Sequence, residues 1–277
     1  MGMLLGNKQM MKNSSGGGGA WDLSSAVFNG DVAINKASGV FFKDDGTKMY
    51  TTRWDSGTFY ELNLSTAWDA TAYSSYQSYN ASAQTTSNYG MFFSPDGLNF
   101  YLMSTSGSLQ DSLLQYSLST AWDITTLSYV RRMNLGTIIS EYNPRGIYFI
   151  DDGLTLFLSG DSTDKIHEFS LSTAWDISTY SLVQSFDVSA FSSRPSGLYF
   201  NPNGLQAYLI DSLSDDIYEL NMSTAWNIST ISLNYTFDLR SLGGSPTPHG
   251  LYIRSDGLKL YVADSNKNKV QEFDLTV

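Results

Sequence analysis

A pattern of roughly 50 residues recurs five times along the chain, and this internal repeat constrains the fold more than any other feature. The hexapeptide LSTAWD occupies residues 64–69, 118–123 and 171–176. A variant, MSTAWN, occupies 222–227, and the fragment AWD occupies 20–22. The spacing is too regular for chance, so the chain is an array of similar units that bury their apolar faces against one another.

A second marker lies between these tryptophan motifs. It consists of a glycine, a short apolar run and an Asp-Gly or Asn-Gly pair, and its copies begin at Gly39, Gly90, Gly146, Gly197 and Gly250. Asp-Gly or Asn-Gly between apolar runs is the strongest short hairpin signal, because both residues accept the positive φ of a tight turn. Each unit therefore predicts four short antiparallel strands, and a radial array of such units is a β-propeller.

The two ends of the repeat region predict how the ring closes. The last residues, KVQEFDLTV, match a third strand without its fourth, whereas the residues after Trp21 match a fourth strand without partners. We therefore expect an all-β, five-bladed propeller over residues 20–277, in which residues 26–34 pair with residues 269–275 and leave no open edge. The interval from Trp21 to Gly39 is shorter than in the other copies, which predicts a shortened closing strand or a shortened loop.

Charge and residue usage exclude several function classes. The formal net charge of −11 argues against nucleic acid or an anionic membrane as the main partner. Because the chain has no Cys, it has no disulfide, thiol nucleophile or thiolate metal site. His167 and His249 are its only histidines, so a multi-histidine zinc site is not expected. We therefore expect no cofactor and no bound metal. We also expect no membrane insertion, since no apolar run approaches the ~18 residues of a membrane helix.

Residues 1–19 precede the repeats and end in a Gly/Ser run, which is typical of a flexible linker. The apolar run near the start is too short for a secretory signal, and no small-residue cleavage site follows it. One interpretation is a tail without function. The other is an arm that docks on a partner through its apolar side chains, which are Met3, Leu4, Leu5, Met10 and Met11.

The pattern FxPDGxxxY, carried most fully by residues 93–101, resembles the repeats of YVTN-type bacterial β-propellers. Combined with the repeated YxLSTAWDIST, it is similar to propeller repeats of uncharacterised marine bacterial proteins and of phage virion proteins. The resemblance covers about residues 20–277. It implies the propeller architecture and brings no catalytic motif, and propellers host enzymes, lectins and scaffolds alike.

The repeated tryptophans and turn aspartates are predicted to be structural. Each tryptophan follows a third strand at the same turn, where an indole can cover the base of a blade, and the following Asp suits a capping turn. The alternative is a ring of aromatic residues that stack on a ligand. The hairpin residues Asp45, Asp96, Asp152 and Asp256 are likewise expected to form turns.

Polar residues that differ between the copies are the candidates for ligand binding. They stand before the first strand or after the second strand of each unit, and these loops meet at one mouth of the central channel. The candidates are Trp54, Asp55, Tyr89, Arg145, Asp161, Arg194, Asp211, His249 and Asp264. Such a group suits a sugar, a carboxylate or a Ca²⁺ ion. The alternative interpretation is that these residues only terminate strands.

Catalytic motifs are absent from the sequence, which contains no GxSxG, no HExxH and no P-loop. We therefore expect no catalytic residues and a non-enzymatic protein. The first prediction is a structural or recognition component of a bacteriophage particle, assembled in the host cytoplasm and tethered to other virion subunits by the arm. The second is a lectin-like propeller that binds a glycan, in a bacterial extracellular or cytoplasmic setting. A small-molecule hydrolase or lactonase ranks third.

Overall fold

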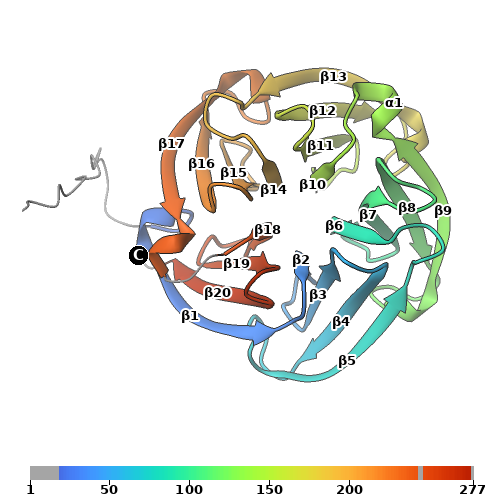
Figure 1. Cartoon of the computed structure of the whole chain (residues 1–277), viewed down its shortest axis with the longest axis horizontal. Helices are drawn as coiled ribbons and strands as arrows, with labels where there is room; N and C mark the ends of the chain where they lie inside the picture. Colours follow the sequence, from blue (N-terminus) through green and yellow to red (C-terminus); the bar gives the residue numbers. More distant parts are fainter. Residues whose placement is uncertain (1–18, 243–245, 276–277) are drawn as a thin grey trace, which may run out of the picture.

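Five four-stranded antiparallel sheets surround a central axis in the computed structural model of the chain (Figure 1). The structure describes residues 19–242 and 246–275. The predicted five-bladed β-propeller is confirmed. The arm residues Met3, Leu4, Leu5, Met10 and Met11 lie outside the described residues.

Four blades are built from consecutive strands, each running from the channel to the rim. Blade 1 contains β2 (Ala37–Phe42), β3 (Lys48–Arg53), β4 (Thr58–Leu64) and β5 (Tyr73–Asn80). Blade 2 contains β6 (Ser87–Phe93), β7 (Asn99–Ser106), β8 (Ser112–Leu118) and β9 (Leu127–Asn134). Blade 3 contains β10 (Pro144–Phe149), β11 (Thr155–Gly160), β12 (Lys165–Leu171) and β13 (Tyr180–Asp187). Blade 4 contains β14 (Pro195–Phe200), β15 (Gln206–Asp211), β16 (Asp216–Met222) and β17 (Ile231–Asp238).

Blade 5 joins the two ends of the chain. It contains β18 (Pro248–Ile253), β19 (Lys259–Asp264), β20 (Lys269–Leu275) and, as its outer strand, β1 (Ala26–Ala33). Ala26 pairs with Leu275 and Ala33 with Lys269, which confirms the predicted closure. β1 is eight residues long, like the other four outer strands, so the shortening lies in the loop before β2 and not in the strand.

Helical structure among the described residues is limited to short turns. One α-helical turn, α1 (Leu135–Ile139), lies between blades 2 and 3. Five 3-10 turns complete the set: Leu23–Ser25, Ile124–Thr126, Ile177–Thr179, Ile228–Thr230 and Leu239–Leu242.

Each repeated tryptophan joins its own turn to the first hairpin of the same blade. The Trp68 amide donates to the Gly46 carbonyl at 3.0 Å, and the Trp68 indole covers Gly46 in the first hairpin. The same contact joins Trp21, Trp122, Trp175 and Trp226 to the hairpin glycines of their blades. The following Asp accepts an amide hydrogen bond two residues on, as Asp123 does from Thr125. The structural interpretation of the tryptophans is thus confirmed.

A hydrogen bond from the second strand of one blade reaches the tryptophan turn of the next. The Tyr50 hydroxyl donates to the Trp122 carbonyl at 2.7 Å, and Tyr101, Tyr208 and Tyr261 make the same bond. At the seam between blades 3 and 4, Phe157 takes the place of the tyrosine and has no hydroxyl to donate. The seams are therefore equivalent except for this one.

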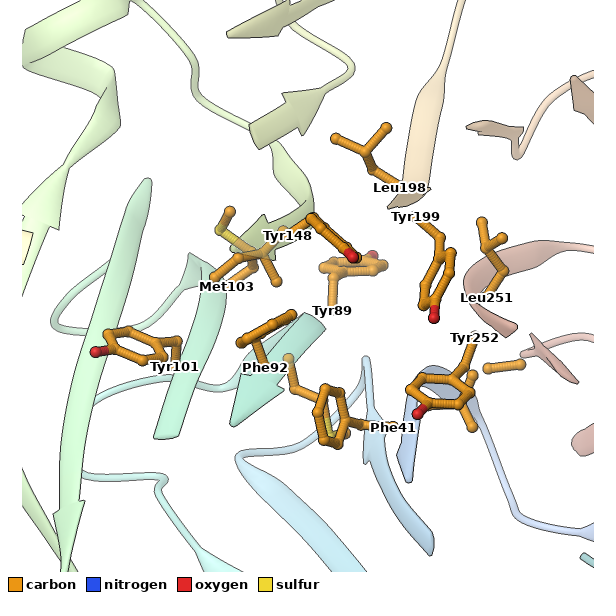
Figure 2. Packing of buried hydrophobic residues seen from close by; sticks show 14 of the residues in the cluster. Phe41, Tyr89, Phe92, Tyr101, Met103, Tyr148, Leu198, Tyr199, Leu251 and Tyr252 are labelled. Atoms are coloured by element: carbon orange, nitrogen blue, oxygen red, sulfur yellow. The ribbon is translucent and has the colours of Figure 1, made fainter. Parts of the chain in front are cut away.

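The innermost strands pack closely around the axis. A Cβ on Gly90 would lie 2.3 Å from the carbonyl oxygen of Arg145, so neighbouring inner strands approach backbone to backbone. Two residues after the marker glycine, one aromatic side chain from each blade joins a closed ring of edge-to-face contacts, with centroids 5.3–5.7 Å apart (Figure 2). We call these side chains the aromatic ring; they are Phe41, Phe92, Tyr148, Tyr199 and Tyr252.

The two faces of the propeller carry different connections. The apical face carries the loops that enter each first strand and those that follow each second strand. The basal face carries the Asp-Gly or Asn-Gly hairpins and the tryptophan turns. The aromatic ring lies near the basal end of the channel, because each of its residues is the last but one of its inner strand. It therefore separates the apical mouth from the basal rim.

Candidate functional site: the apical mouth of the channel

Three side chains from three blades meet at the apical mouth. Tyr89 comes from β6, Arg145 from β10 and His249 from β18. The guanidinium carbon of Arg145 lies 3.8 Å from the centroid of the Tyr89 ring, a cation–π contact. The imidazole of His249 meets the same ring edge to face, with centroids 5.1 Å apart. These three predicted site residues are therefore brought together.

Two arginines share one carboxylate beside this cluster. Arg145 Nη2 lies 2.9 Å from Asp161 Oδ2, and Arg194 Nε lies 3.9 Å from the same oxygen. Arg145 and Asp161 are each 11 % exposed at the side chain, whereas Arg194 is 47 % exposed. Taken alone, this group of two arginines and one aspartate carries one positive charge in excess, although the whole chain carries −11. The exposed guanidinium of Arg194 is the part of the group that can attract an anion.

His249 adds no charge to the mouth at neutral pH. Burial lowers its pKa to about 3, and the charges of Arg145 and Arg194 act in the same direction. Its Nδ1 is buried, as are Nε and Nη1 of Arg145, and none of these atoms has a hydrogen-bond partner within the part of the chain that the structure describes. Buried polar atoms are usually paired, so these three are candidates to meet a ligand or water.

Asp211, a predicted ligand-binding residue, joins the apical loops of its own blade. It ends β15, is buried, and accepts hydrogen bonds from Ser192 Oγ at 2.8 Å and from the amides of Ser193 and Leu213 at 2.7 Å. Burial raises its pKa, but these donors outweigh burial and the pKa is lowered overall. Its carboxylate is therefore occupied by the apical loops of blade 4.

Asp264 is the counterpart of Asp211 in blade 5. Its Oδ1 accepts from the amides of Thr247, Asn266 and Lys267 at 3.0–3.1 Å. Its Oδ2 is buried and has no hydrogen-bond partner within the described residues. Asp211 and one oxygen of Asp264 thus accept from backbone amides of the loops of their own blades, which need acceptors. Ligand binding by these two carboxylates stays a prediction.

Glu141 is a buried acid that the sequence did not identify. In blade 3 the position of Asp211 is held by Gly160, and a Cβ there would lie 2.3 Å from the Glu141 carboxyl carbon. Glu141 accepts from the amides of Asn143 and Ser162 and from Thr163, so it replaces the missing Asp. The sequence could have shown this. Gly160 lies three residues after Phe157, just as Asp211 lies three residues after Tyr208. Asp161 lies one position later, which frees it for Arg145.

Trp54 and Asp55 lie apart from the arginine cluster in their contacts. Lys36 Nζ lies 5.7 Å from the Trp54 ring centroid, and Asp55 pairs with Arg53 at 3.1 Å. Among the described residues these contacts stay within blade 1 and the short loop before it. They form a separate patch of the apical rim.

Two further features bear on the chemistry of the chain. Within residues 19–242 and 246–275, no three acidic or histidine side chains are grouped closely enough to hold a metal ion. No helix in this part of the chain is long and apolar enough to cross a membrane.

Neither a protein-family model nor a curated protein matches the sequence. Solved propeller structures do resemble the fold. A luciferin-regenerating enzyme is 12 % identical, with 90 % of this chain and 96 % of that chain covered and a TM-score of 0.54. A putative 6-phosphogluconolactonase from Bacteroides uniformis is 16 % identical, with 90 % and 74 % covered and a TM-score of 0.51.

The β-propeller domain of Cps50 (Swd1) from Myceliophteria thermophila is 12 % identical, with 91 % of this chain and 100 % of that chain covered and a TM-score of 0.51. At these identities the likeness shows the propeller fold alone, and the names of these neighbours span different functions.

Proposed function

We propose that this protein is a non-enzymatic recognition component of a bacteriophage particle. Its apical mouth binds a carboxylate-bearing ligand, an acidic sugar of a host-surface glycan foremost, and residues 1–19 attach it to other virion subunits. The observation that carries the proposed binding site is the convergence of Arg145 and Arg194 on the single carboxylate of Asp161. The lectin-like alternative uses the same site without the particle.

The chemistry of the mouth favours a carboxylate over a neutral ligand. Arg194 is half-exposed, and its side chain makes no hydrogen bond within the described residues beyond the long contact to Asp161. A guanidinium presents paired N–H donors that match a carboxylate in two parallel hydrogen bonds. Tyr89 and the neutral His249 fix Arg145 from behind, so the mouth is preorganised for binding.

A matched pair of arginine variants tests this site. We expect Arg194→Ala to weaken binding of N-acetylneuraminic acid or glucuronate about tenfold, because it removes a charge-assisted contact. Arg240→Ala is the control, since Arg240 is equally exposed but pairs with Asp238 on the outer rim of blade 4. Isothermal titration with each sugar acid, and with glucose as the neutral reference, measures the effect. Equal binding of glucose and glucuronate, or no loss in Arg194→Ala, would refute the site.

The particle assignment rests on the sequence resemblance and on the arm. A chain lacking residues 1–19 should fail to enter the particle while keeping its circular dichroism spectrum and its sugar binding. Normal copy number of this truncated chain in purified particles would contradict the tether, and would leave the propeller faces as the attachment surface.

A further inference from the structure

The basal mouth of the channel carries two carboxylates that form no ion pair with any described residue. Each blade contributes to this rim the residue two positions before its hairpin glycine, and all five are exposed: Asp44, Pro95, Asp151, Pro202 and Ser255. Two basic residues stand one position earlier in the same hairpins, but Lys43 pairs with Asp45 and Arg254 with Asp256, each at 2.6 Å.

Three phenol groups lie just inside this rim. Tyr148, Tyr199 and Tyr252 belong to the aromatic ring and are only 7–9 % exposed (Figure 2). Their hydroxyl oxygens still touch solvent, since, unlike the Tyr116 hydroxyl, none of them is a fully buried polar atom without a partner. None of these three hydroxyls makes a hydrogen bond to any residue in the described ranges, whereas the second-strand tyrosines such as Tyr50 all donate to a carbonyl.

The charges of the two carboxylates act on the phenols. Burial raises the pKa of Tyr252, and the charge of Asp44, the nearby Tyr148 and the charge of Asp151 raise it further. Burial also raises the pKa of Asp44, the charges of Asp151 and Asp45 add to this effect, and the charge of Lys43 opposes it. Asp44 and Asp151 therefore repel each other, and a cation between them would relieve this repulsion.

We propose that the basal mouth binds a primary ammonium group, either of a small alkylamine or of a lysine side chain on a partner. The three N–H groups of one ammonium donate to acceptors drawn from the carboxylates of Asp44 and Asp151 and the phenol oxygens of Tyr148, Tyr199 and Tyr252. The faces and edges of the aromatic ring receive the alkyl carbon and the positive charge.

The geometry suits an organic cation better than a metal ion. With neighbouring centroids 5.3–5.7 Å apart, a charge on the axis lies about 5 Å from all five rings, within the range of cation–π attraction. A divalent ion such as Ca²⁺ takes about six to eight oxygen ligands, and the described rim offers only two carboxylates. The site is independent of the proposed apical site, since the aromatic ring lies between them.

Titration of the full chain with methylammonium at low ionic strength tests the proposal. We expect saturable binding, followed by calorimetry or NMR, that weakens at least tenfold in Asp44→Asn/Asp151→Asn. The matched control is Asp96→Asn/Asp152→Asn, which removes the same charge from hairpin positions next to the rim, where both side chains cap the hairpins and pair with no cation among the described residues. An equal loss in the control would reduce the effect to general charge attraction and overturn the site, as would no binding to the parent chain.

Phenol-to-phenyl replacement tests the hydroxyl groups without disturbing the core. Phe41 and Phe92 already occupy two of the five ring positions, so Tyr148→Phe/Tyr199→Phe/Tyr252→Phe should fold normally. We expect this triple variant to bind methylammonium severalfold more weakly than the parent chain. Its affinity for tetramethylammonium, which has no N–H, should be unchanged. Equal affinity of the parent for both ions overturns the hydrogen-bonding role. Nα-acetyl-lysine methylamide distinguishes the sources: tighter binding than methylammonium indicates a protein partner, and weaker binding a free amine.

Discussion

The two mouths of the channel differ in how far the five blades repeat one another. At the basal mouth the packing of the five blades is nearly alike, because every hairpin is covered by its own indole and every ring position holds an aromatic side chain. Only the exposed rim residues differ there. At the apical mouth the blades differ, and the site is assembled from single residues such as Arg145, His249 and Tyr89. Packing therefore constrains the base in every copy, whereas the apical loops only need acceptors for their amides.

The apical loops meet that need by different means. Blade 4 uses Asp211 at the end of its second strand, and blade 3 uses Glu141 from the loop before its first strand, with Gly160 making room. Both blades thus keep a buried carboxylate that accepts from the loop amides, but it comes from a different position in the chain. This exchange frees the next residue, Asp161, to pair with Arg145, and so it places a charge at the channel.

Removal of the blade 3 acceptor is the strongest test of this comparison. Glu141→Ala should lower the free energy of unfolding by about 3 kcal/mol, because several buried amide and hydroxyl donors lose a charged acceptor. Urea denaturation measures the loss.

The double variant Glu141→Ala/Gly160→Asp supplies the control. It moves the acceptor to the position it has in blade 4, and we expect it to recover part of the stability. Gly160→Asp alone should be destabilised, since its side chain meets Glu141. A double variant no more stable than Glu141→Ala would contradict the view that the two acids are interchangeable.

The neutral histidine gives the apical mouth a pH dependence. The pKa of His249 is lowered by burial to about 3, against an ordinary value near 6.5, so the unfolded chain binds the proton first. Its contribution to stability is complete above pH 6.5 and is lost as the pH falls toward 3. Between pH 6.5 and 4.5 the loss should reach about 2 kcal/mol.

His249→Gln isolates this contribution. The pKa of His167 is also lowered by burial, to about 4, and His167 remains in both chains, so its effect cancels in the difference. The stability of the parent chain relative to His249→Gln, measured by urea denaturation at each pH, should fall with acidification. A difference that stays constant from pH 7 to pH 4.5 would show that His249 is not buried as a neutral ring.

The sequence predicted the repeated parts of the molecule well and the single-copy parts poorly. Five copies of the hairpin and tryptophan markers specified blade number, strand order and closure, since each copy checks the others. The grouping of Arg145 with His249 was predicted for the same reason, because both stand one position before a marker glycine. The loop contacts of Asp211 and Asp264 were not predicted, because the direction of a carboxylate depends on which loop amides lack acceptors. That information exists only after the loops are folded.

The smallest predicted effect concerns the basal seam that departs from the repeat. The Phe157 ring stacks against Trp226 with centroids 6.4 Å apart and planes 18° apart, much as Tyr208 does against Trp21 at 6.3 Å and 28°. Phe157→Tyr should therefore place a hydroxyl beside the Trp226 carbonyl and raise the free energy of unfolding by about 1 kcal/mol. Tyr208→Phe, at the equivalent position of the next seam, should lower it by a similar amount. Thermal denaturation of both variants measures the pair. If Phe157→Tyr were destabilising, the blade 3 to blade 4 seam would differ from the others in backbone position as well as in its missing hydroxyl, and the base would be less regular than its sequence.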